Sequence, residues 1–182
     1  MKTTNFKIGV VAMAAIFTLV SCNTENQQSK TENDHSQHQT AANPEVPKIK
    51  NEALDALYPH YLTLQEALVI GDIGRAKEAA LLVEETSKQI DEAKALQGAA
   101  AQVLAAETLE SQRNGFSLLS DAFISLIKTT GIEKGELYIA HCPMAFNDKG
   151  ANWLSPSKNI KNPYFGDKML SCGSIEETLK KL

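Results

Sequence analysis

The sequence predicts a mainly α-helical fold, a four-helix up-and-down bundle followed by a small C-terminal β-hairpin and loop subdomain. Between residues 51 and 131, apolar side chains recur at three- and four-residue steps in four successive segments. Short turn signals separate these segments, as is typical of antiparallel neighbouring helices. After Gly135 the helical period is lost, and aromatic, glycine and proline residues crowd together.

The N-terminal residues form a leader that is set aside before the fold is considered. Two lysines flank the start of a short apolar run over residues 8–20, which ends at Ser21-Cys22. This layout is typical of a secretory signal, and the run is shorter than the roughly 20 residues that span a bilayer. The ending "LVSC" resembles the lipobox of bacterial lipoproteins. We therefore expect residues 1–21 to be a signal peptide and Cys22 to carry the lipid anchor, in the cell envelope and on the periplasmic side of the outer membrane.

Residues 22–47 have almost no large apolar side chain, so we expect a flexible tether. His35 and His38 lie in it as "HSQH", and these two residues are either a weak metal ligand pair or solvated polar side chains.

The formal net charge is −4, and removal of Lys2 and Lys7 with the leader makes it −6. An acidic chain argues against nucleic acid as a partner. The remaining residues 48–182 suffice for one domain with its own core.

The four predicted helices divide the first part of this domain. Their expected ranges are 51–72, 73–93, 95–112 and 113–131. In the first helix we expect Pro59 to mark either the start or a kink. Gly71 and Asp72 provide a stop and the cap of the next helix, and Gly131 ends the last one. No carboxylate pair or Glu-x-x-His motif in these helices suggests a metal site inside the bundle, and we expect no enzymatic activity.

The C-terminal region, residues 136–173, is rich in sulfur, and its sequence predicts strands and turns. We expect a strand over residues 136–146, turns at 148–150 and at Asn162-Pro163, and a short return segment over 167–173. Ser174 and Glu177 have the spacing of a capping box, which predicts a final helical turn or two at the C-terminus.

All sulfur that remains after Met1, Met13 and Cys22 are assigned to the leader and the anchor lies in this region. The four residues are Cys142, Met144, Met169 and Cys172. If residues 138–146 are extended, Cys142 and Met144 project from one face and His141 from the other, which makes His141 the weaker candidate ligand. Two thiolates and two thioethers would select Cu(I) or Ag(I), and Trp153 and Tyr164 could shield such a site from water.

Two other readings of these cysteines remain open. A Cys142–Cys172 disulfide would suit an oxidising compartment and would make the domain a structural or interaction module without metal. A catalytic Cys142 with His141 as its base is a third reading, which the opposite orientation of adjacent strand residues disfavours.

The run "HCPMAFNDKGANWLSPSKNIKNPYFGDKMLSCG", together with Tyr61, Leu64 and Leu68 and with Arg113 and Phe116, resembles a poorly characterised bacterial lipoprotein domain family. That family is related to the C-terminal, heavy-metal-binding domain of membrane fusion proteins of copper and silver efflux systems. The resemblance implies soft-metal binding at Cys142, Met144, Met169 and Cys172, and a copper efflux pump component as a partner. The chain lacks the separate "CPMHP"-type module of some relatives, so either metal delivery or sequestration is compatible with it.

Overall fold

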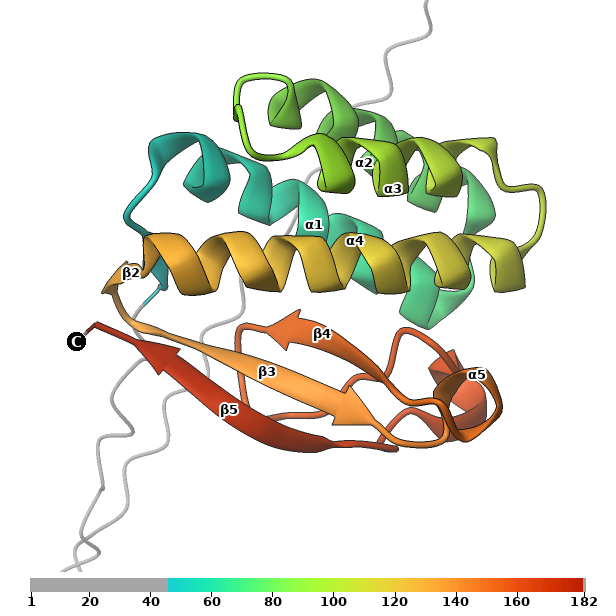
Figure 1. Ribbon diagram of the computed structural model, residues 1–182. Helices are drawn as coiled ribbons and strands as arrows, with labels where there is room; N and C mark the ends of the chain where they lie inside the picture. Colours follow the sequence, from blue (N-terminus) through green and yellow to red (C-terminus); the bar gives the residue numbers. More distant parts are fainter. Residues whose placement is uncertain (1–45, 182) are drawn as a thin grey trace, which may run out of the picture. The chain divides into compact units, whose positions relative to one another are not determined.

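We describe a computed structural model of the chain, in which residues 46–181 are placed. Residues 46–181 form four long helices and a small antiparallel sheet, and one pair of helices lies between the sheet and the other pair (Figure 1). The long helices are α1 (Glu52–Ile70), α2 (Ile73–Ser87), α3 (Lys94–Ala105) and α4 (Leu109–Thr130). Each packs against the next along the chain, and α4 also contacts α1 and the sheet. The prediction of a mainly helical fold with a small C-terminal antiparallel region is confirmed.

Helix α1 runs through Pro59 without ending there, so a helix start at Pro59 was wrong. The N-cap is Asn51, whose side chain accepts hydrogen bonds from the N–H groups of Ala53 and Leu54, both at 3.0 Å. Pro59 lies on the exposed side of the helix, where water can satisfy the carbonyl that lacks its usual donor. The helix ends at Gly71, which adopts the left-handed conformation with φ 77°.

The boundary between the third and fourth helices differs from the prediction. α3 ends at Ala105 and α4 begins at Leu109, although we expected the division near residue 112. Thr108 and Ser111 form a capping box, in which each side chain accepts a hydrogen bond from the other's backbone N–H, at 3.1 and 3.2 Å. The cap satisfies N–H groups of the first turn and starts the helix four residues earlier than expected.

The C-terminal region is a three-stranded sheet, which adds a strand to the predicted hairpin. The central strand β3 (Glu136–Cys142) pairs antiparallel with β4 (Ala151–Ser155) and with β5 (Ser174–Lys180). A separate short pair joins β1 (Lys48–Ile49) to β2 (Ile132–Lys134). The helical turn predicted after Ser174 was wrong, because β5 occupies those residues. Ile175 and Leu179 both pack on the core, and their four-residue spacing fits strand alternation as well as a helix.

The predicted strand over residues 136–146 was too long. β3 ends at Cys142, a turn follows, and the short α5 (Ala145–Asp148) contains three consecutive residues with left-handed backbone: Phe146, Asn147 and Asp148, with φ of 53°, 58° and 62°. Strand alternation therefore does not extend from Cys142 to Met144. The expected return segment over residues 167–173 begins instead as a 3-10 helix, η1 (Gly166–Met169).

Tyr61 of α1 joins the helices to the sheet inside the core. Its side chain is fully buried, and its hydroxyl lies 2.5 Å from Ser120 Oγ on α4 and accepts a hydrogen bond from the Leu154 N–H of β4 at 2.9 Å. Phe116 stacks on its ring and Phe123 packs against it at a tilt, with centroids 5.4 and 5.1 Å away. In the placed part of the chain, no helix combines the length and the apolar character that crossing a membrane requires.

Candidate thiol site

The two cysteines of the folded domain meet at the end of β3 that is next to α5. Cys142 is the last residue of β3, and Cys172 lies in the turn between η1 and β5. Their Sγ atoms are 3.2 Å apart although 30 positions separate the residues in the chain. Both are free thiols; Cys142 is completely buried, whereas Cys172 is half-buried. The two cysteines that the sequence analysis placed in one site are therefore close in the structure.

Asn162 holds the turn that carries Cys172, and nothing in the sequence analysis identified it as more than a turn residue. Its side chain is fully buried and donates from Nδ2 to the Cys172 carbonyl at 2.8 Å. Its Oδ1 accepts from the N–H groups of Tyr164 and Phe165 at 2.8 and 3.2 Å. One side chain therefore fixes both ends of the loop that leads to Cys172. The Asn162-Pro163 dipeptide indicated the turn in the sequence, but the burial of the asparagine is visible only in the structure.

Gly173 lets the turn approach the central strand. A Cβ atom at this position would lie 2.7 Å from the His141 carbonyl oxygen and 2.9 Å from Trp153 Cη2, and the residue has a φ of 137°. Any side chain would push the turn, and the adjacent Cys172, away from β3. Trp153 is itself fully buried on β4, and it packs edge-on against Tyr164 at a centroid distance of 5.9 Å.

Contact between the sulfurs changes the acidity of the more exposed one. The pKa of Cys172 is raised above its ordinary value, chiefly because its thiol shares a hydrogen bond with Cys142 and further because of burial and of repulsion from Cys142. The Cys172 thiolate is therefore harder to form than that of an isolated cysteine while both thiols are present. Removing a proton from this pair requires something that stabilises the thiolates, such as a cation, or a higher pH.

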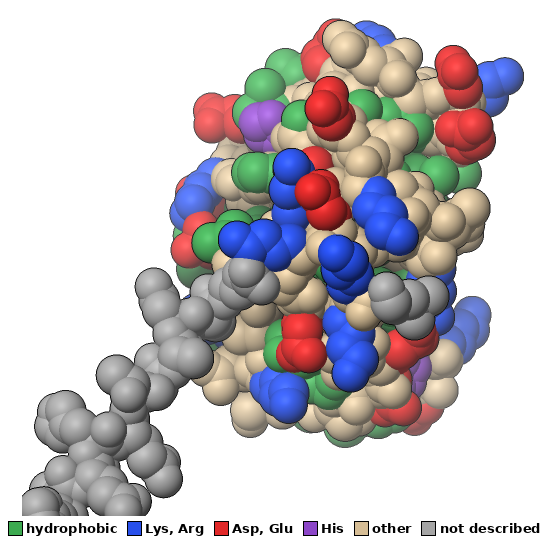
Figure 2. Space-filling view, turned by 90° about the vertical axis from the view of Figure 1, so that its left-hand side faces the viewer, with side chains coloured by type: hydrophobic (Ala, Val, Ile, Leu, Met, Phe, Trp, Pro, Cys, Tyr) green, Lys and Arg blue, Asp and Glu red, His purple; other side chains and the backbone are tan. Residues whose placement is uncertain are grey.

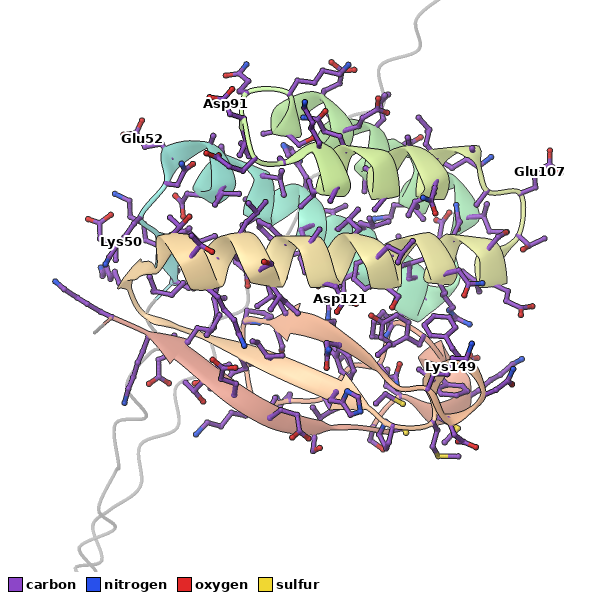
Figure 3. All side chains as sticks on the ribbon, viewed as in Figure 1. Lys50, Glu52, Asp91, Glu107, Asp121 and Lys149 are labelled. Carbon is purple, nitrogen blue, oxygen red and sulfur yellow. The ribbon has the colours of Figure 1, made fainter. Side chains whose placement is uncertain are left out.

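The methionines lie in the same corner of the molecule as the cysteines, where the sulfur atoms gather beside α5 (Figure 3). Met169 ends η1 and is half-buried, and its carbonyl accepts a hydrogen bond from the Cys172 N–H at 3.1 Å. Met144 is 48 % exposed and lines a surface cavity of about 680 Å³ together with Arg113, Phe146 and Lys168. The thioethers thus lie in the same part of the molecule as the two thiols, whose sulfur atoms are in direct contact.

His141 points away from the thiols, as its position next to Cys142 on the strand predicted. Its Nδ1 lies 2.8 Å from Asn152 Oδ1, and Asn152 in turn donates to Asp121 Oδ1 at 3.5 Å. Asp121 projects from α4 toward the sheet (Figure 3), and burial raises the pKa of its carboxyl, an effect that the Asn152 hydrogen bond opposes. This chain of polar groups is separate from the thiol pair, so His141 is not placed to take a proton from Cys142.

Within residues 46–181, no three His, Cys, Asp or Glu side chains are arranged to hold a metal ion. A metal ion at the thiol pair would accordingly have only two ligands of these types and would need thioether sulfur or a low coordination number. The two histidines of "HSQH" and Cys22 fall outside the placed residues.

Comparison with known protein families finds a match to the helical part of the chain. Residues 57–135 match a family described as a protein of unknown function (DUF3347). The match covers α2, α3, α4 and most of α1, and it ends before β3 and the thiol site. No curated protein and no solved structure matches the chain.

Proposed function

We propose that this protein is an envelope lipoprotein that binds a soft metal ion, Cu(I) or Ag(I), through Cys142 and Cys172, either sequestering the ion or passing it to a copper efflux pump component. The observation that carries the proposal is the 3.2 Å contact between two thiols from distant parts of the chain. Thiolate and thioether ligands select Cu(I) over hard cations. The thioethers in the same corner of the molecule add donors of the same character.

The donor set fits a soft ion. The Cys142 thiol lies in the core, where an unpaired thiolate would be costly, so a bound cation would offset the charge that deprotonation creates. Cys172 lies on a turn and is the thiol that solvent reaches first. The burial of Trp153 and Tyr164 beside it would keep water from the bound ion. We further propose that α1–α4 form an up-and-down bundle, which the packing of each helix against the next supports.

A disulfide-stapled structural module is the second candidate. The same 3.2 Å contact favours it, because a small approach of the sulfurs would allow an S–S bond of about 2.05 Å. Under this hypothesis Met169 is an ordinary packing residue, and Met144 is an exposed side chain without a chemical role. The thiol chemistry of protein isolated without reductant distinguishes the two, since a complete disulfide leaves no thiol to react.

The deciding experiment measures Cu(I) affinity by competition with a chromophoric chelator. It uses the reduced mature chain, residues 22–182, with Cys22→Ser to remove the third thiol. We expect one Cu(I) per chain, replaceable by Ag(I), and loss of this binding in Cys142→Ser and Cys172→Ser. Affinity should fall at acid pH because protons compete for the thiolates.

Replacing Met144 and Met169 with Leu tests the thioethers. Leu keeps the approximate volume, so stability should change by less than about 1.5 kcal/mol. If a thioether binds the ion, Cu(I) affinity falls while the fold persists. Unchanged affinity would leave the two cysteines as the whole site, and absence of Cu(I) binding by the reduced parent chain would reject the proposal in favour of the disulfide module.

The envelope location has its own test. If Cys22 carries acyl chains, the full-length protein partitions into detergent and Cys22→Ser moves it to the soluble fraction, because stable anchoring depends on those chains. A wild-type protein that is already soluble would refute the anchor without affecting the metal proposal.

A further inference from the structure

Five lysines gather at the end of the domain where the placed chain begins and ends. β1 pairs with β2, and β2 adjoins β5. Across the β1–β2 pair, Lys48 lies directly opposite Lys134, and the C-terminal end of β5 lies beside them. We use the term lysine face for Lys48, Lys50, Lys134, Lys180 and Lys181. Figure 2 views the molecule from this end and shows several Lys and Arg side chains there, with some Asp and Glu side chains among them.

Acidic residues only partly neutralise the lysine face. Glu133 pairs with Lys48 at 3.3 Å, and Glu136 accepts a hydrogen bond from the Tyr138 hydroxyl at 2.6 Å. No residue in the placed part of the chain forms an ion pair with Lys50, Lys180 or Lys181. Five lysines and two glutamates leave a net charge of +3 here, whereas the whole chain carries −4. The molecule is therefore electrically polarised, with its positive pole at this end.

The nearest further acidic side chains among residues 46–181, Asp55 and Glu52, do not form ion pairs with the lysine face. Asp55 turns toward the backbone, because its Oδ1 accepts a hydrogen bond from the Ile49 N–H at 2.9 Å. Glu52 starts α1 and points away from the sheet, while Lys50 lies lower on the same edge (Figure 3). Between the strands lies a hollow of about 610 Å³, lined by Lys134, Lys180 and Lys181 among others. Glu133 and Glu136 also line this hollow, so its three lysines exceed its two carboxylates by one charge.

We infer that the lysine face docks on anionic phospholipid headgroups and sets the orientation of the domain on a membrane. Two observations select a membrane over a soluble polyanion. The sequence N-terminal to Val46 leads back to Cys22, so the basic end is the end nearest the expected anchor. The rest of the chain is acidic, so an anionic bilayer repels the other faces and attracts this one. A lysine close to such a surface contributes about 1 kcal/mol, and the effect decays within a Debye length of about 8–10 Å.

This orientation has a consequence for the thiol site. β3 begins at the lysine face with Glu136 and ends at Cys142, and a seven-residue strand is about 20 Å long. Docking by the lysine face would hold the thiols at the far end, toward solvent. The inference does not rest on metal binding, and it applies equally to a disulfide module.

Vesicle binding tests the inference without the lipid anchor. The probe is the mature chain with Cys22→Ser, mixed with vesicles of phosphatidylcholine alone or of phosphatidylcholine with 40 % phosphatidylglycerol. We expect binding to the anionic vesicles only, weakening as NaCl rises from 25 to 300 mM. Lys50→Gln, Lys180→Gln and Lys181→Gln together should lower the partition coefficient at least tenfold, since each lysine contributes up to about fivefold. The matched control is Lys77→Gln, Lys149→Gln and Lys168→Gln, which removes the same charge; Lys149 lies at the other end of the domain (Figure 3).

Three results would overturn the inference. The first is equal binding to neutral and anionic vesicles, and the second is an equal loss in the control variant. The third is binding to soluble heparin but not to anionic vesicles, which would assign the face to a soluble polyanion. Thermal unfolding followed by circular dichroism establishes that both triple variants are folded before binding is compared.

Discussion

Oxidation of Cys142 and Cys172 to a disulfide should stabilise the domain. The number of residues between the two cysteines determines the size of this stabilisation. The bond would close a loop of 30 residues. In the chain-entropy account, a loop of that length lowers the entropy of the unfolded chain enough to add about 3.6 kcal/mol at 25 °C. With an unfolding entropy of about 2.1 cal/mol/K per residue, this corresponds to a rise in melting temperature of roughly 12 °C for a domain of this size. Cys142 and Cys172 need little movement to react, so native strain should subtract little.

The assay is calorimetry of the mature chain carrying Cys22→Ser, oxidised with diamide or reduced with a phosphine. Mass spectrometry after alkylation counts the thiols in each sample. The chain that also carries Cys142→Ser and Cys172→Ser controls for direct effects of the reagents and should melt at one temperature in both. If the sample is fully oxidised and the two forms melt within about 2 °C of each other, the loop-entropy argument fails. If the thiols remain alkylatable after diamide, the pair is not positioned as described.

Three further outcomes are expected. Tyr61→Phe leaves the buried Leu154 N–H without its acceptor and should cost about 1–3 kcal/mol in urea denaturation, whereas Tyr138→Phe, at a half-exposed hydroxyl, should cost little. Because the pKa of Cys172 is raised in the folded state, the reduced protein should lose stability as pH rises through that pKa, and alkylation of Cys172 should reach half-maximal rate above the usual cysteine range near 8.5. Asn162→Ala removes the bond to the Cys172 carbonyl and should lower the effective concentration of the two thiols, measured in a glutathione redox buffer, at least tenfold.

Helices were predictable where apolar spacing was regular, and their ends were predictable where a single residue type decides them. Gly71 and Gly131 end α1 and α4 as expected, since both have positive φ. The start of α4 was missed because Thr108 and Ser111 cap one another through small hydroxyl groups, while the prediction relied on apolar periodicity. β5 was missed because a capping-box spacing is a local signal, and pairing with β3 is a long-range effect that no local pattern contains.

The candidate site was predictable in its composition and only partly in its geometry. The pairing of Cys142 with Cys172 followed from the small number of thiols, and the outward turn of His141 followed from strand alternation. The position of Met144 did not follow, because alternation ends at Cys142 and Phe146 begins a left-handed turn. Three consecutive non-glycine residues in this conformation are held by tertiary context and not by their own preferences. No sequence rule would place Met144 immediately before such a turn.

The asymmetry of the two thiols determines how either proposed chemistry could proceed. Cys142 is buried at the end of a strand that is paired on both sides, so it is the fixed partner. Cys172 is half-buried on a turn, and its backbone is held through the Met169 carbonyl and the Asn162 side chain. From a contact of 3.2 Å, closing to a disulfide requires the sulfurs to approach by about 1.1 Å. Admitting a metal ion with metal–sulfur bonds of about 2.3 Å requires the sulfurs instead to part, to about 3.8 Å for a tetrahedral S–metal–S angle and to about 4.6 Å for a linear one. The two changes move Cys172 in opposite directions relative to Cys142. Oxidation and metal binding use the same two sulfur atoms, so each should exclude the other.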